Sequence, residues 1–161
     1  MKIVVYPVEY ENPEHGADLL ALMDHYAQDP MGGGQALPDS VRQTLVSNLA
    51  QLPHVISFLA YAENKAVGLV NAFELFSTFA NEPLINIHDI VVHSDYRGQG
   101  IAQHLLAVVE EVAKARGCCK LTLEVLSGNT SAQTTYKRFG FESYALDPDK
   151  GEAWFWQKTL N

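Results

Sequence analysis

The stretch Tyr96-Arg97-Gly98-Gln99-Gly100-Ile101-Ala102 is the most informative part of this chain. It follows a segment of strand character, 84–93, and opens the most regular helical pattern of the sequence, 100–116. The first N–H groups of a helix lack internal partners and lie at the positive end of the helix dipole. Glycine lets an anion approach them closely, so this stretch is predicted to bind a pyrophosphate, with Arg97 adding a positive charge.

A glycine turn that only starts the helix is the alternative interpretation. A dinucleotide-binding Gly-x-Gly-x-x-Gly motif is not favoured, because its third glycine would fall at Gln103. The run Gly32-Gly33-Gly34 lacks the Lys-Ser/Thr pair that follows a phosphate loop. It is therefore expected to be a connector or a mobile loop over a pocket.

Hydrophobic periodicity predicts a mixed α/β chain, and no linker divides it, so residues 1–161 are expected to form a single domain. Strands are predicted at 3–9, 55–62, 66–76, 84–93, 121–126, 141–146 and 153–160. Helices are predicted at 13–28, 38–52, 100–116 and 129–139. The strand–helix–strand unit over 84–126 implies a parallel pair with a right-handed crossover.

Composition narrows the classes of partner. The chain has 161 residues, a formal net charge of −8 and a pI near 5.1, so a nucleic-acid partner is not expected. No apolar stretch approaches the ~20 residues of a membrane span. The only cysteines, the adjacent Cys118 and Cys119, form neither a disulfide framework nor a metal motif. A reduced, cytoplasmic protein without a metal site is predicted.

A second group of residues opens the helical segment 129–139. Asn129, Ala132 and Tyr136 are spaced i, i+3 and i+7, so they share one helix face. The small Ala132 leaves room for a thin ligand between an amide and a phenol, and the phenol can donate a proton. A buried tyrosine that bonds to the backbone is the alternative interpretation.

Both groups of residues resemble the motifs of a known family. Residues 97–102 resemble the Gln/Arg-x-x-Gly-x-Gly/Ala loop of the GNAT N-acetyltransferases, and Asn129, Ala132, Tyr136 and Gly140-Phe141 resemble their second motif. The stretch 88–97 most resembles the polyamine acetyltransferase branch, although His88 stands where that branch has a glutamate. The resemblance implies a mostly antiparallel sheet of six to seven strands with a central, splayed parallel pair and about four helices.

The resemblance also implies roles for individual residues. The backbone of Ile90, Val91 and Val92 would pair with the pantetheine arm of acetyl-CoA. The pyrophosphate would be held by Arg97, Gly98, Gln99, Gly100, Ile101 and Ala102. Asn129 would contact the pantetheine arm beside Ala132, and Tyr136 would protonate the departing CoA thiolate.

Three side chains are candidates for the base that removes a proton from the attacking amine. His88 titrates near neutrality, Asp89 could act itself or attract the amine, and Glu74 lies on a neighbouring strand. On a regular strand His88 and Asp89 point to opposite faces, and a bulge would change this.

The sequence therefore predicts an acetyl-CoA-dependent N-acetyltransferase that acts on the primary amine of a small, cationic molecule in a ternary complex. A protein or peptide N-acetyltransferase is one alternative, and a non-catalytic acyl-CoA-binding sensor is the other. A homodimer is a further expectation, since dimers are common in the family.

Overall fold

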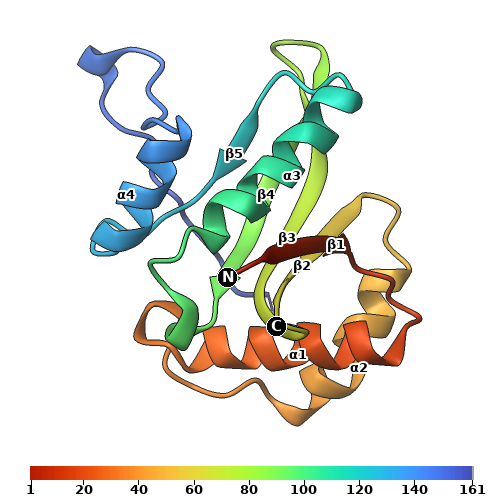
Figure 1. Cartoon of the computed structure of the whole chain (residues 1–161). Helices are drawn as coiled ribbons and strands as arrows, with labels where there is room; N and C mark the ends of the chain where they lie inside the picture. Colours follow the sequence, from red (N-terminus) through yellow and green to blue (C-terminus); the bar gives the residue numbers. More distant parts are fainter. Residues whose placement is uncertain (161) are drawn as a thin grey trace.

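A computed structural model describes residues 1–160 as one mixed sheet between two pairs of helices (Figure 1). The strands are β1 (Ile3–Pro7), β2 (Val55–Ala62), β3 (Lys65–Ser77), β4 (Glu82–Val92) and β5 (Leu121–Leu123). The helices are α1 (Pro13–Gln28), α2 (Asp39–Ala50), α3 (Ile101–Ala115) and α4 (Thr130–Phe139). Short 3₁₀ turns lie at Pro30–Gly32, Ser94–Tyr96 and Pro148–Lys150.

The strands are arranged in sequence order, β1-β2-β3-β4-β5, and only β4 and β5 are parallel. The predicted parallel pair, formed by the strands before and after α3, is therefore confirmed. Glu63 and Asn64 connect β2 to β3 with positive φ angles of 48° and 66°. Two such residues make the tight turn whose twist matches the flanking strands of a hairpin.

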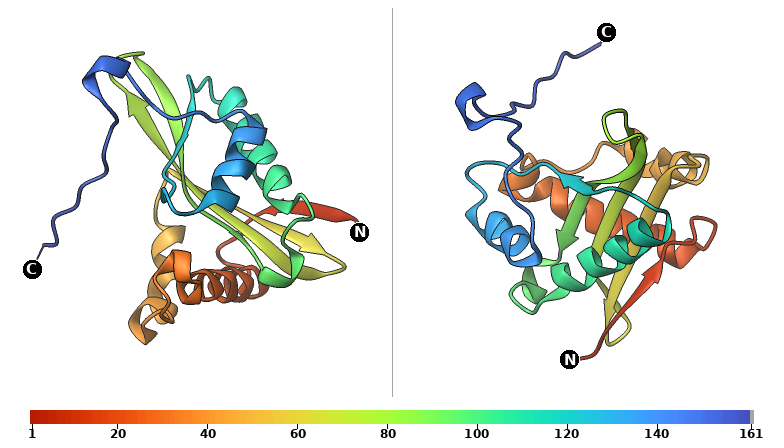
Figure 2. Two further views of the ribbon diagram at one scale, coloured as in Figure 1. Left: turned by 90° about the vertical axis from the view of Figure 1, so that its left-hand side faces the viewer. Right: turned by 90° about the horizontal axis from the view of Figure 1, so that it is seen from above.

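Helices cover both faces of the sheet (Figure 2), and each face has its own hydrophobic core. On one face α3 buries one stripe against the strands, made of Ile101, Leu105, Leu106, Val109 and Ala113. On the other face α1 and α2 pack through Leu19, Leu22 and Leu49. Fully burying such an aliphatic side chain contributes about 1.5–3 kcal/mol, so these two layers hold the sheet between them.

The expectation of six to seven strands with a central parallel pair is wrong, because residues 1–160 form a sheet of five strands in which the parallel pair, β4 and β5, lies at one edge. The predicted strand 121–126 ends at Leu123, and 141–146 and 153–160 pair with no strand in residues 1–160. In the turn at Pro148–Lys150 the Asp147 side chain accepts a hydrogen bond from the Asp149 N–H at 3.0 Å. The chain after this turn runs away from the sheet (Figure 2), so the apolar run 153–156 meets no strand of residues 1–160, and Trp156 is 78% exposed.

Candidate active site

The glycine loop between β4 and α3 presents free backbone donors. Gly98 and Gly100 have φ angles of 77° and 81°, a left-handed conformation that favours glycine. A Cβ atom built on either would have no atom within 4 Å, so the space beside the loop is open. Within residues 1–160, no backbone carbonyl accepts a hydrogen bond from the amides of 98–102. These amides are therefore available to an anion.

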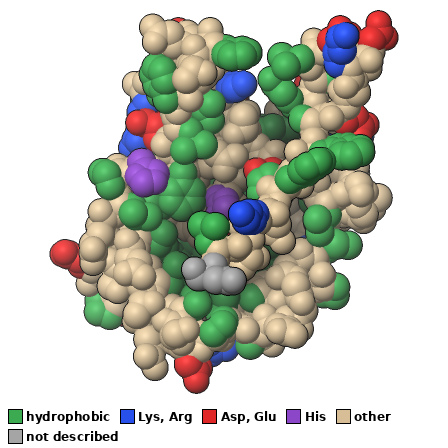
Figure 3. All heavy atoms as spheres, turned by 180° about the vertical axis from the view of Figure 1, so that it is seen from behind, with side chains coloured by type: hydrophobic (Ala, Val, Ile, Leu, Met, Phe, Trp, Pro, Cys, Tyr) green, Lys and Arg blue, Asp and Glu red, His purple; other side chains and the backbone are tan. Residues whose placement is uncertain are grey.

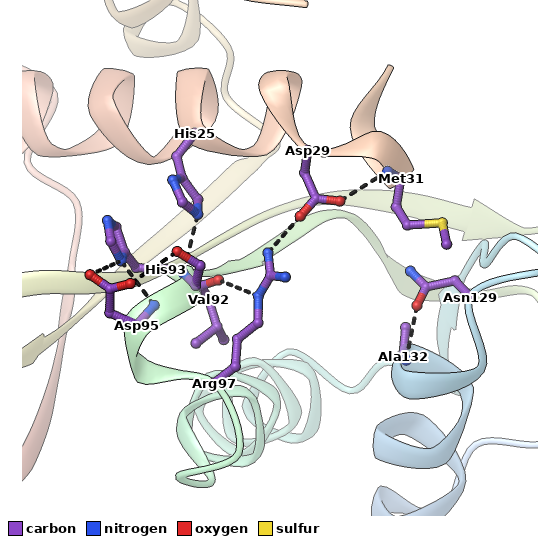
Figure 4. Close-up of polar contacts among 10 residues, drawn as sticks. His25, Asp29, Met31, Val92, His93, Asp95, Arg97, Asn129 and Ala132 are labelled. Carbon is purple, nitrogen blue, oxygen red and sulfur yellow. Dashed lines mark hydrogen bonds and ion pairs between the residues drawn. The ribbon is translucent and has the colours of Figure 1, made fainter. Parts of the chain in front are cut away.

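Arg97 ties this loop to the end of α1 (Figure 4). Its Nη2 donates to Asp29 Oδ2 at 2.8 Å, and its Nε donates to the Val92 carbonyl at 3.2 Å. The hydrogen bond from Arg97 lowers the pKa of Asp29, and the Met31 N–H also donates to this carboxylate. Asp29 was not singled out from the sequence.

A pair of stacked histidines makes a second link between α1 and the loop. The Ser94 N–H donates to His25 Nε2 at 3.1 Å, and the rings of His25 and His93 stack with centroids 4.3 Å apart (Figure 4). Burial lowers the pKa of His25, and His93 and Arg97 lower it further. His25 is therefore held in the neutral form that can accept this hydrogen bond.

Strands β4 and β5 separate beside the loop. They pair only from Ile85 to Ile87, opposite Leu121 to Leu123, whereas β4 continues to Val92. The edge of β4 beyond Ile87 therefore faces no strand of residues 1–160. Val92 uses its carbonyl on this side to accept from Arg97, and the backbone of Ile90, two residues earlier, faces the same way.

A β-bulge determines where the candidate bases lie. Asn71 of β3 pairs with Asp89, but the next residue, Ala72, pairs with Ile87, so His88 is an extra residue in β4. Bulges of this kind re-aim side chains. The expectation for a regular strand, with His88 and Asp89 on opposite faces, is therefore wrong.

Both side chains lie on the face covered by α1 and α2. The His88 ring meets Phe73 edge-on, with centroids 5.6 Å apart, and Phe73 packs in the α1–α2 core. Asp89 accepts from Asn71 Nδ2 at 3.1 Å, and the same nitrogen lies 3.4 Å from Met23 Sδ of α1. Seen from behind, histidine and hydrophobic side chains surround a hollow in the surface (Figure 3).

Glu74 is separated from the other two candidate bases. Along β3, Ala72 belongs to the α3 core and Phe73 to the α1–α2 core, so alternation puts Glu74 on the α3 side. There it pairs with Arg116 Nη1 at 3.1 Å. The structure therefore brings His88 and Asp89 together on one face and Glu74 to the other.

Helix α4 carries the second group of predicted residues. Asn129 caps the helix, and its Oδ1 accepts from the Ala132 N–H at 3.1 Å, which leaves its amide nitrogen free of that contact (Figure 4). Burial, with a smaller effect from Tyr26, raises the pKa of Tyr136 to about 12. Tyr136 is therefore a neutral phenol, able to donate a proton, at any ordinary pH.

Tyr26 of α1 links this helix electrostatically to β4. Burial raises its pKa, and the charge of Asp89 raises it further. Because Tyr26 in turn raises the pKa of Tyr136, Tyr26 lies within electrostatic range of both Asp89 and Tyr136. Tyr26 was not singled out from the sequence.

Residues 19–141 match the model of the acetyltransferase (GNAT) family, and the chain belongs to that family. The aminoglycoside N(6')-acetyltransferase type 1 of Salmonella typhimurium is 26% identical over 108 residues, 65% of this chain and 74% of that protein. The thialysine N-epsilon-acetyltransferase of Bos taurus is 41% identical over 70 residues, 44% of this chain and 39% of that protein.

Solved structures agree at the level of the fold. An aminoglycoside acetyltransferase from an uncultured soil metagenomic sample, in complex with sisomicin, superposes with a TM-score of 0.79 at 18% identity. The match covers 99% of this chain and 97% of that one. No helix within residues 1–160 is long and apolar enough to cross a membrane. The same residues contain no group of three or more metal-binding side chains.

Proposed function

We propose that this single-domain chain transfers the acetyl group of acetyl-CoA to the primary amine of a small, cationic molecule by direct attack in a ternary complex. The observation that carries the proposal is a convergence at the open end of β4. Free amides of the glycine loop lie at that end, His88 and Asp89 share one face of the strand, and Tyr26 lies within electrostatic range of both Asp89 and Tyr136.

The residues around the loop fit a coenzyme A molecule. The amides of 98–102 and the Arg97 guanidinium are donors for a pyrophosphate. The unpaired edge of β4 at Ile90 offers backbone groups to an amide-bearing arm, and the Asn129 amide nitrogen is a further donor. When bound, acetyl-CoA supplies an acetyl group activated as a thioester.

Different side chains of the protein then carry out the two proton transfers, from the attacking amine and to the leaving sulfur. An alkyl ammonium, with a pKa of ~10.4, must lose a proton before it can attack. Asp89 holds the cation by its charge, and His88, next to it on the same face, accepts the proton. Tyr136 donates its phenolic proton to the sulfur that leaves, which its raised pKa of about 12 permits.

The relatives favour a small amine over a protein. Those reported above are named for aminoglycoside and thialysine acetylation, and both compounds carry amino groups. The acidic net charge of −8 also favours a cationic acceptor. The particular amine stays open between these two classes and the polyamines.

We also propose that the chain forms a homodimer through its C-terminal segment, defined as residues 152–160. Trp154, Phe155 and Trp156 are 76%, 74% and 78% exposed. Such side chains offer roughly 500 Å² of surface per chain. Two exchanged segments and the surfaces that they cover therefore exceed the about 1,000 Å² of a specific interface. The unpaired edge of β5 is a suitable acceptor for an extended segment of a second copy.

Turnover of an amine panel tests the proposed function. Purified protein is mixed with acetyl-CoA and either sisomicin, thialysine, spermidine or a lysine-containing peptide, and free thiol is measured. Turnover of a small amine supports the proposal, whereas turnover of the peptide alone favours the protein-acetylating alternative. Saturable binding of acetyl-CoA without thiol release with any amine would favour the sensor.

Light scattering after size exclusion tests the dimer. The wild-type protein is expected at twice its 17.8 kDa mass, and Trp154→Ser with Trp156→Ser is expected at the monomer mass. Phe79→Ser is the matched control, because Phe79 is a 94% exposed aromatic residue in the connection between β3 and β4, outside this segment. A monomeric wild-type protein would contradict the proposal.

A further inference from the structure

Four polar side chains form a continuous chain of hydrogen bonds that ends at Asp89. The Tyr10 hydroxyl donates to Ser57 Oγ at 2.8 Å, and Ser57 Oγ donates to Asn71 Oδ1 at 2.6 Å. Asn71 Nδ2 then donates to Asp89 Oδ2 at 3.1 Å. We call Tyr10, Ser57, Asn71 and Asp89 the transverse row, because they cross the sheet perpendicular to its strands.

Strand register builds this row. Ser57 of β2 is the direct cross-strand partner of Asn71 of β3, and Asn71 is the direct partner of Asp89 of β4. The bulge at His88 begins immediately beyond this pair, so the row occupies the last regular position before the strand is re-aimed. Tyr10, in the connection between β1 and α1, reaches the row from its outer end.

The two buried side chains of the row do not stabilise the fold more than apolar residues would. Ser57 and Asn71 are 5% and 3% exposed, and they are the polar side chains that the described part of the chain buries. Ser57 interrupts the otherwise apolar strand Val55–Ala62, and Asn71 interrupts the run 66–73 of β3, which is otherwise free of polar side chains. A buried hydroxyl or amide contributes little net stability even when it is paired, so a pair of apolar residues would hold these strands at least as well.

In each hydrogen bond of the row, the donor is the residue farther from Asp89 and the acceptor is the residue nearer to it. Turning the Asn71 amide over would set its carbonyl oxygen against the Asp89 carboxylate, so the carboxylate fixes the amide's orientation. Ser57 can then only donate to Asn71, and Tyr10 can only donate to Ser57. Burial raises the pKa of Tyr10, which keeps its hydroxyl a donor. The row donates a hydrogen bond to Oδ2 of Asp89 and leaves Oδ1 available to a cation.

We propose that Asn71, Ser57 and Tyr10 are positioning residues, which hold the Asp89 carboxylate in the orientation that binds the ammonium group of the acceptor. This inference rests on the proposed function, since it assigns Asp89 to the amine. An asparagine side chain does not relay a proton in this arrangement, so the row orients Asp89 and does not carry protons away from it.

Steady-state kinetics test the row through Asp89. Asn71→Leu keeps the side-chain volume and removes the last donor, and it is expected to raise the KM for the amine about tenfold. The KM for acetyl-CoA should stay within about twofold, because the glycine loop is untouched. Tyr10→Phe removes only the outermost donor and should raise the amine KM less.

Two comparisons separate positioning from general damage. Val70→Ala is the matched control, because Val70 is the neighbouring residue of β3, is fully buried and belongs to the α3 core. It should lower the melting temperature without the selective rise in amine KM. In the Asp89→Asn background, Asn71→Leu should add no further loss, since its effect passes through Asp89. An additive loss, or equal rises in both KM values, would overturn the proposal.

A crystal structure of Asn71→Leu gives a readout that needs no turnover. The Asp89 carboxylate is expected to leave the position it holds in the wild-type crystal, while the backbone of β4 stays in place. If the carboxylate keeps its position, the positioning role is refuted even when the enzyme is active. If no amine is acetylated by the wild-type protein, the proposed function fails, and this crystal comparison still decides whether the row orients Asp89.

Discussion

The left-handed backbone at Gly100 makes a quantitative prediction for coenzyme A binding. An alanine there has free space, since no atom lies within 4 Å of its Cβ, so its cost comes from the φ angle of 81° alone. A non-glycine residue in this conformation costs about 1–2 kcal/mol. If the loop keeps its shape, stability falls by that amount, which lowers Tm by about 2–8 °C. If the loop relaxes, binding must restore the shape, and Kd rises about 5–30-fold.

Gly117 provides the control at the other end of α3. Its φ angle is 70° and the space beside it is equally open, so Gly117→Ala carries the same strain. Titration calorimetry with coenzyme A and thermal melts are run on both variants. We expect Gly117→Ala to lose only stability, and Gly100→Ala to lose affinity to the extent that its loop relaxes. Wild-type affinity in Gly100→Ala together with a wild-type Tm would refute the reasoning, because the strain must appear in one of the two measurements.

Three further predictions concern protons and charge. Tyr136→Phe should lower kcat at least tenfold with an unchanged KM for acetyl-CoA, and Tyr6→Phe, an exposed tyrosine, should change neither. Because the pKa of Tyr136 is raised to about 12, its donor is present below that pH, so the wild-type rate should not fall between about pH 8 and 10. His88→Gln should lower kcat at least tenfold, whereas an unchanged kcat would exclude His88 as the base. His25 has a lowered pKa in the folded protein, so the unfolded chain binds this proton more readily. The contribution of His25 to stability is therefore full above about pH 6.5 and falls as the pH drops. His25→Gln should flatten this dependence in thermal melts recorded from about pH 5 to 8.

Local sequence patterns were sufficient to predict most of the helices and strands. The helix Pro13–Gln28 and the strand Val55–Ala62 have the predicted bounds, because caps and hydrophobic period agree there. The C-terminal segment shows where such signals fail. Its alternating apolar residues describe a surface that suits a sheet, but strand formation also requires a free edge within reach, and the residues alone do not say which edge that is.

The positions of His88 and Asp89 could not be predicted for a related reason. Period two assigns them to opposite faces, and only the pairing of Asn71 with Asp89 and of Ala72 with Ile87 reveals the extra residue between them. The sequence did contain a sign of the row beside it, since Ser57 and Asn71 each interrupt a run of apolar residues within a strand. A polar side chain in the middle of a buried strand needs a partner, and the partner of Asn71 is the residue next to the bulge. Searching an apolar strand for such an interruption, and then asking which polar group it serves, therefore finds candidate positioning residues that motif patterns miss.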